Sequence, residues 1–169
     1  MKVILAENLP SIDGTLYRSI SGQWLTGVTV VTTRDEHDRA VGLTMSAVSP
    51  LSLNPPQFLV NLDLGSETLT AILVRKAFCI NFLGSNQREV CSQFAKKGSD
   101  KFAGMAHRSG ELGMPVIEGA IAYVECTVAD VFNSGDHSII VGDARYGKVS
   151  GGSPLAYFRS AFRELAHCE

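Results

Sequence analysis

Runs of β-branched and other apolar residues, separated by short polar segments, predict several strands in this chain. Residues 27–33 and 40–49 carry such runs on either side of the polar segment 34–39, which indicates a β-hairpin. The pair Pro55-Pro56 ends the second run, because proline donates no hydrogen bond to a neighbouring strand. Further strands are expected at 57–63, 77–82, 120–132 and 138–149.

The strands at 120–132 and 138–149 are long, and the turn residues Asn133-Ser134-Gly135-Asp136 lie between them. They are therefore expected to form a two-stranded ribbon.

Apolar residues at helical spacing predict a short helix within 16–25 and two more at 66–76 and 86–97. Ser66 is placed to cap the second of these helices. The segment 154–163 fits either a last strand or a short helix. About six or seven strands with two or three helices predict a mainly β fold, an antiparallel Greek-key-type barrel rather than a doubly wound sheet.

Composition narrows the class of protein. The 169 residues are expected to form one domain, 1–169, with its core at about 15–165. Fifteen Lys and Arg against 17 Asp and Glu leave a net charge of −2, so no nucleic-acid partner is expected. No apolar run approaches the roughly 20 residues that cross a bilayer, so no membrane contact is expected. Four cysteines without a C-x-x-C pair favour reduced thiols and a cytoplasmic location: Cys79, Cys91, Cys126 and Cys168.

Several common catalytic motifs are missing from the sequence. There is no G-x-G-x-x-G after a strand, no phosphate-binding G-x-x-x-x-G-K-[ST] and no G-x-S-x-G. The four histidines are widely separated, so no metal site is expected.

Two segments are candidates for ligand binding. In 44–49, the hydroxyls at 44 and 46 are expected on one face of a strand, where they could hydrogen-bond a flat ring that the small residues let approach the backbone, although an ordinary half-exposed strand also explains them. In 63–68, free amides and two hydroxyls at a helix start would suit a phosphate, although a plain N-cap needs no ligand.

Two further segments carry charge. Lys101 follows a helix end rich in lysine and precedes Phe102, so it is a candidate cation for a phosphate, against the alternative of a solvated helix terminus. Gly135-Asp136-His137 lies at the ribbon turn, where Asp136 would orient the imidazole. Turn chemistry alone explains the glycine and the aspartate but leaves His137 unexplained.

In this order and spacing, these segments resemble the short-chain flavin reductase family, the reductase components of two-component flavin-dependent monooxygenases. The resemblance extends from about residue 17 to residue 162. It is carried by residues 26–32, 42–44, 52–56, 66, 68, 81–83, 94–95, 100–102, 125–126, 135–137 and 154–158.

The resemblance implies an FMN-binding split β-barrel that works as a homodimer. The implied activity is NAD(P)H:flavin oxidoreductase, which passes hydride to FMN or FAD and supplies reduced flavin to a separate monooxygenase component. NADH is slightly preferred over NADPH, because no arginine cluster awaits a 2′-phosphate. Two alternatives stay open: an enzyme with tightly bound FMN that reduces ferric iron or a cobalt corrinoid, and a non-catalytic flavin- or haem-binding module.

The resemblance also implies roles for individual residues. The flavin-binding set is Thr44, Met45, Ser46, Ala47 and Ser49 along the ring, Asp63, Ser66 and Thr68 toward the phosphate, and Asn81, Phe82, Lys101 and Phe102 around the pocket. His137 is the catalytic candidate and would contact the nicotinamide together with Asp136 and Tyr157. Asn54 and Ser160 depart from the aspartate and glycine that are common in the family, and the second departure affects the wall of the nicotinamide pocket.

Overall fold

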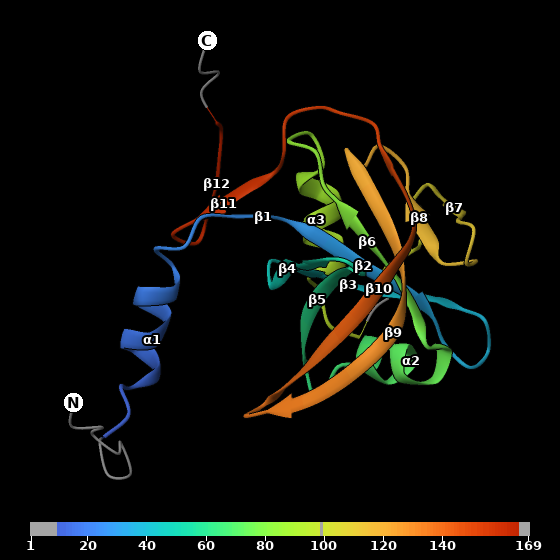
Figure 1. The fold of residues 1–169 in the computed structure, drawn as a ribbon. Helices are drawn as coiled ribbons and strands as arrows, with labels where there is room; N and C mark the ends of the chain where they lie inside the picture. The colour runs from blue at the N-terminus through green and yellow to red at the C-terminus, as the bar shows by residue number, and fades with distance from the viewer. Residues whose placement is uncertain (1–9, 99, 166–169) are drawn as a thin grey trace.

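The computed structural model describes residues 10–98 and 100–165, which form three helices and three antiparallel sheets (Figure 1). The main sheet has seven strands in the order β3-β2-β6-β9-β10-β5-β4. Their bounds are β2 Thr29–Arg34, β3 Ala40–Met45, β4 Val48–Leu53, β5 Pro56–Asp63, β6 Ala77–Phe82, β9 Ala122–Ser134 and β10 His137–Val149. The predicted mainly β fold is confirmed.

The sheet curls into a barrel that stays split between its two outer strands. These strands, β3 and β4, follow one another in the chain but pair with different neighbours, β2 and β5. Residues Ser46 and Ala47 connect them, so the single strand expected at 40–49 is wrong. The chain has to cross from one end of the sheet to the other at this point, and a continuous strand cannot make that crossing.

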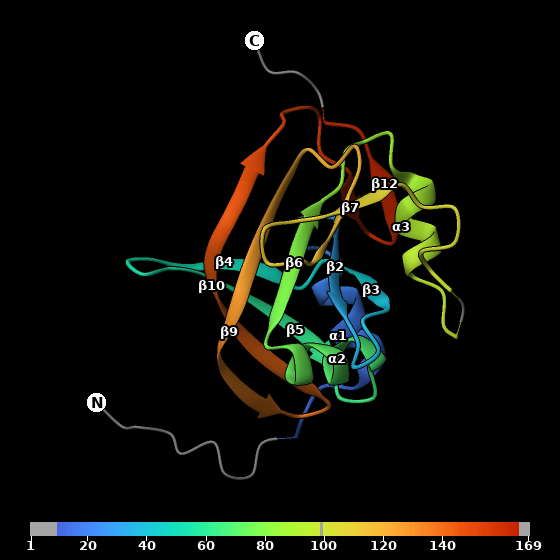
Figure 2. The same ribbon diagram turned by 90° about the vertical axis from the view of Figure 1, so that its right-hand side faces the viewer.

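Three hairpins build most of the main sheet. The β2–β3 hairpin and the β9–β10 ribbon were predicted, whereas the β4–β5 hairpin was not. In the β4–β5 hairpin, which projects from the body in Figure 2, Leu53 pairs with Pro56 across Asn54 and Pro55. Pro56 is the first residue of β5, a position where a missing amide is tolerated. The β9–β10 ribbon turns at Gly135 and Asp136 and contains two register shifts.

Apolar side chains fill the curled sheet. Val31, Val60, Ile80 and Ile140 are fully buried there, and α2 (Glu67–Arg75) closes one end with Leu69 and Ile72. This is the face of α2 that the spacing predicted, and Ser66 caps the helix by accepting a hydrogen bond from the Leu69 amide.

The other helices differ from one another in how they are packed. Helix α3 (Arg88–Phe94) is shorter than the predicted 86–97 and buries Phe94 in a second cluster. Buried Gln87 precedes it, and its side chain bonds both the Gly84 amide and the Glu118 carbonyl. Helix α1 (Gly14–Ser21) has no buried residue and lies apart from the body in Figure 1.

The C-terminal segment is a hairpin, so the strand interpretation of 154–163 is confirmed. Strand β11 (Ala156–Phe158) pairs with β12 (Ala161–Arg163) and with β1 (Thr26–Gly27). The two turn residues, Arg159 and Ser160, both have positive φ. Ser160 therefore occupies a backbone conformation that favours glycine.

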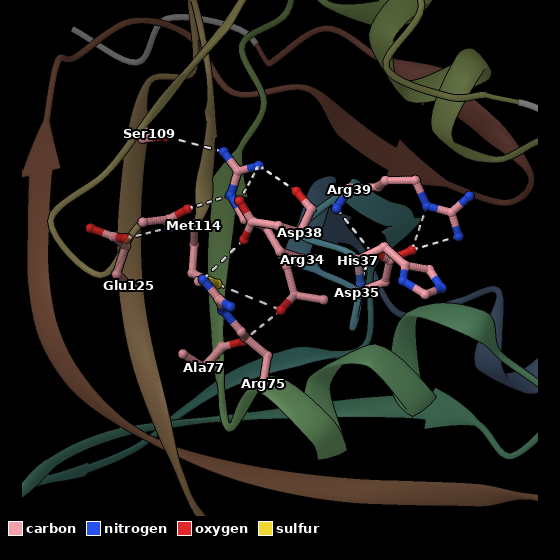
Figure 3. Close-up of polar contacts among 12 residues, drawn as sticks. Arg34, Asp35, His37, Asp38, Arg39, Arg75, Ala77, Ser109, Met114 and Glu125 are labelled. Atoms are coloured by element: carbon pink, nitrogen blue, oxygen red, sulfur yellow. Dashed lines mark hydrogen bonds and ion pairs between the residues drawn. The ribbon is translucent and has the colours of Figure 1, made fainter.

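A small hairpin of β7 (His107–Ser109) and β8 (Pro115–Ile117) was not predicted. The fully buried Glu125 carboxylate accepts hydrogen bonds from the amides of Glu111, Leu112 and Met114 in its loop. Arg34 bonds the Gly113 carbonyl and Ser109 of the same segment (Figure 3). The buried carboxylate and these backbone amides thus add to a small apolar cluster of Cys79, Met114 and Val116 in holding the hairpin.

Burial explains the cysteines. Cys79, Cys91 and Cys126 are buried free thiols, and Cys168 lies outside the described residues. Burial raises the pKa of Cys126 to about 12. Within the two described stretches, no helix has the length and apolar content to span a bilayer.

Candidate functional site

A small pocket forms where β3 ends. Its volume is about 170 Å³, and it is lined by Val28, Thr44, Met45, Ser46 and Tyr157. The structure therefore brings the first three residues expected along the ring together with Tyr157 of β11. Pockets that enclose a small molecule usually measure about 300–1,000 Å³, so this one holds only part of a flavin-sized ligand.

Protein contacts already use several polar groups of this pocket. The Thr44 hydroxyl donates to the Cys91 carbonyl at 2.7 Å, and the Thr29 hydroxyl donates to the Met45 carbonyl at 2.9 Å. The Met45 side chain packs in the core. These contacts fix the pocket wall, and a ligand meets mainly the exposed Ser46 and Ala47.

The expected pair of hydroxyls on one strand face needs correction. Ser46 lies beyond the end of β3, so it does not share a strand face with Thr44. Ser49 is exposed on β4, where its hydroxyl donates to the Pro50 carbonyl.

A line of residues, which we call the track, runs from Ala47 through Asn61 and Asp63 on β5 to Ser66 at the start of α2. The Ala47 carbonyl accepts a hydrogen bond of 3.0 Å from the Asn61 amide. Two residues later, the exposed Asp63 ends the strand and accepts from the Gly65 amide at 2.8 Å. Ser66 then caps α2. The track joins the two segments that the sequence nominated for a ring and for a phosphate.

The start of α2 offers one exposed polar group and one buried one. Ser66 is partly exposed and uses its oxygen as an acceptor, so its O–H remains a donor for a ligand. Thr68 is only 3% exposed and lies within the packing of α2. Glu67 places a negative charge in the first turn.

Lys101 binds β3, the strand that ends in the residues expected along the ring, rather than projecting into solvent. Its ammonium donates to the Gly42 carbonyl of β3 at 3.0 Å. Burial lowers the pKa of Lys101, and the charge of Glu67 opposes that shift. The Phe102 ring packs edge to face against the rings of Phe94 and His107, with ring centroids 4.9 Å and 4.8 Å apart.

His137 lies beside the end of β5. It pairs with Asp63 in the sheet, and the Leu64 amide donates to the Asp136 carbonyl. His137 Nδ1 lies 2.6 Å from the Asp136 carboxylate, and this hydrogen bond lowers the pKa of Asp136. The carboxylate therefore stays ionised at neutral pH and orients an imidazole that is 45% exposed.

The nicotinamide candidates fall into two places. Tyr157 lines the pocket at the end of β3, whereas Asp136 and His137 adjoin Asp63. Among the described residues, no hydrogen bond or strand pairing joins Tyr157 to His137.

Asn81 and Phe82 lie away from the track. Asn81 is fully buried, donates to Val30 and Thr32, and accepts from the Ile117 amide, so its side chain is committed within the protein. Phe82 packs 6.2 Å from Phe58 and lines a second, apolar pocket of about 270 Å³.

Sequence reasoning missed two residues that shape the site, Gly42 and Asn61. A Cβ on Gly42 would lie 2.8 Å from the Val31 carbonyl and 3.3 Å from the Phe94 ring. A glycine inside a strand pattern signals such close packing. Asn61 had no sequence signal, because its contact with Ala47 depends on the break between β3 and β4.

Comparisons with known proteins find similar sequences and folds over most of the chain. The family model described as "Flavin reductase like domain" matches residues 21–166. The chain is 43% identical over 131 residues to the reductase subunit HsaB of a flavin-dependent monooxygenase from Mycobacterium tuberculosis, covering 78% of this chain and 70% of that protein.

Two further proteins match over nearly their whole length. A flavin reductase of Pseudomonas putida is 35% identical over 98% of this chain and 99% of its own. The solved structure of SgcE6, an NADH:FAD oxidoreductase of Streptomyces globisporus, superposes with a TM-score of 0.87 at 27% identity, covering 96% of this chain and 99% of that one.

Proposed function

This chain belongs to the flavin reductase like family, and we propose that it passes hydride from NADH to a flavin held along residues 44–47. It is an oxidoreductase, a flavin reductase of the kind that supplies reduced flavin to the monooxygenase component of a two-component system. The proposal concerns where the flavin lies and which residues contact each reactant.

The track from the β3 pocket to α2 carries this proposal. Ser46 and Ala47 are exposed, so a flat ring can lie against them, and the Asn61 amide links Ala47 to β5. The two residues from Asn61 to Asp63 advance roughly 7 Å along the strand, which leaves room for a sugar-like chain before Ser66. The N-terminus of α2 then offers amides and a positive dipole end to a phosphate.

The chemistry makes modest demands on the protein. When bound, the flavin supplies N5 as hydride acceptor and NADH supplies the hydride at C4 of its nicotinamide. The protein has to align the two rings and limit water. Thr44 holds β3 in place by donating to the Cys91 carbonyl, and Lys101 does so by donating to the Gly42 carbonyl. Asp136 orients the imidazole of His137.

We assign Thr44 to Ala47, with Asn61, to the flavin ring and its chain, and Ser66 to the phosphate. We further assign Tyr157, which lines the β3 pocket, to cover the ring, and His137, which pairs with Asp63, to contact the nicotinamide nucleotide. NADH is the proposed donor, in line with the name of the Streptomyces protein. FMN and FAD both fit a phosphate seat of this kind.

We also propose a homodimer. Helix α1 has eight residues, too few to be stable alone in water, and exposes Leu16 and Ile20 at 47% and 56%. Trp24, just after it, is 78% exposed. A second copy of the chain that covers this apolar arm (α1 and Trp24) would stabilise the helix. It would also enclose more of the ligand beside the β3 pocket, which alone is too small for a whole flavin.

The test is NADH oxidation measured with added FMN, FAD and riboflavin, and repeated with NADPH. We expect turnover that depends on added flavin and is faster with NADH. Turnover by a yellow, flavin-loaded protein with ferric iron, and none with free flavin, would favour the alternative of a bound-FMN reductase. No NADH oxidation with any flavin would contradict the proposal.

A further inference from the structure

Among residues 10–98 and 100–165, two buried side-chain atoms lack a hydrogen-bond partner, Asn61 Oδ1 and Ser138 Oγ. They lie on the neighbouring strands β5 and β10, next to the proposed track. A buried acceptor without a donor costs free energy, so such a group calls for an explanation.

The two atoms lie on opposite faces of the sheet. Val60 and Leu62, on either side of Asn61, are 0% and 1% exposed and point into the core. Side chains alternate along a strand, so Asn61 points to the other face, together with Asp63 and its partner His137. Ser138 pairs with Leu62 and therefore faces the core.

Asn61 also lies between the two ends of the proposed flavin site. Its amide bonds the Ala47 carbonyl at 3.0 Å, Asp63 follows two residues later, and Ser66 begins the helix cap. A ligand with its ring at 44–47 and its phosphate at Ser66 passes this side chain with the part of the molecule that joins the two.

On the basis of the proposed function, we propose that the partly exposed Asn61 side chain turns its unpaired Oδ1 toward the ligand and accepts a hydrogen bond from a hydroxyl of the ribityl chain. Oxidised riboflavin has donors only at N3 of its ring and on its ribityl hydroxyls. The hydroxyls lie on the segment between ring and phosphate, which is where the unpaired oxygen is found. Asn61 is thus a binding residue that distinguishes flavins with a polyol chain from bare isoalloxazines.

The test compares riboflavin with lumiflavin, which has the same ring but a methyl group in place of the ribityl chain. Dissociation constants are measured by flavin fluorescence for the unaltered protein, Asn61→Ala and Ser138→Ala. Asn61→Ala is expected to weaken riboflavin about threefold to tenfold and lumiflavin less than about twofold. Ser138→Ala, on the core face, is expected to change neither.

Equal weakening of both flavins by Asn61→Ala would place the contact on the ring and overturn the proposal, as would unchanged riboflavin binding. If the alanine variant fails to fold, Asn61→Leu, which keeps the approximate shape of the side chain but removes the acceptor, takes its place. Weaker riboflavin binding with lumiflavin binding kept then supports the proposal, and unchanged riboflavin binding overturns it. Failure of the unaltered protein to bind either flavin would overturn the proposed function instead.

Discussion

At the residue scale, hydrogen-bond partners separate polar side chains that hold the fold from those free to meet a ligand. Asn81 is fully buried and all its bonds are made within the protein. Ser46 is exposed beyond a strand end, and Asn61 keeps an unpaired oxygen. All three have residue types suited to flavin binding, so composition and spacing alone do not tell them apart.

His137 provides a prediction at this scale. Replacing it by alanine is expected to raise KM for NADH about fivefold and to change riboflavin affinity less than twofold, because its imidazole adjoins the track without lying in the β3 pocket. Steady-state kinetics and fluorescence titration measure the two effects. His37→Ala, an exposed histidine in the β2–β3 turn, is the matched control and should change neither. Equal losses for NADH and riboflavin would contradict the assignment.

At the element scale, the start of α2 combines a structural cap with a candidate phosphate seat. Ser66 accepts from the Leu69 amide, and Glu67 adds a charge that favours the helix but repels a phosphate. The two roles make different predictions for stability and for binding.

Ser66→Ala is expected to lower the free energy of unfolding by about 1 kcal/mol, and Ser66→Gly by only a few tenths. The alanine variant should weaken FMN about fivefold relative to riboflavin, because a donor to the phosphate is lost. Glu67→Gln should have the opposite effect on binding and tighten FMN relative to riboflavin. Urea denaturation and fluorescence titration provide the values. If FMN and riboflavin respond alike in both variants, the phosphate does not lie at α2.

The β7–β8 hairpin depends on one buried carboxylate. Glu125 accepts three backbone amides, and a glutamine can supply only one acceptor oxygen in its place. Glu125→Gln is therefore expected to destabilise the protein by about 2–4 kcal/mol. The exposed Glu89→Gln on α3 is the control and should stay within about 0.5 kcal/mol. A similar, small change for both in urea denaturation would mean that the charge of Glu125 is not needed there.

At the scale of the whole molecule, local patterns predicted most elements but not how distant segments meet. The hairpins, the ribbon and the capped helix α2 follow from alternation, turn residues and helical spacing. The break at Ser46 and Ala47 does not, because it arises from the closing of the curled sheet. The contacts of Asn61 and Lys101 depend on that closing and so were beyond the reach of sequence patterns.

The apolar arm around α1 gives a prediction at this scale. Leu16→Glu combined with Ile20→Glu places charges on its exposed apolar face. In a dimer the double substitution removes the burial of four apolar side chains, two from each copy, and is therefore expected to weaken the dimer tenfold or more. Thr15→Glu, on the same helix, should leave the dimer intact. Light scattering coupled to size exclusion reports the mass. A dimer unchanged by the double substitution would show that α1 is not its interface.

The most direct test of the central claim is a crystal structure of the protein with FMN. We expect the ring along residues 44–47 beside Tyr157, the ribityl chain at Asn61 and the phosphate at Ser66. A flavin seated instead in the apolar pocket of Phe58 and Phe82, with residues 44–47 uncovered, would contradict the account.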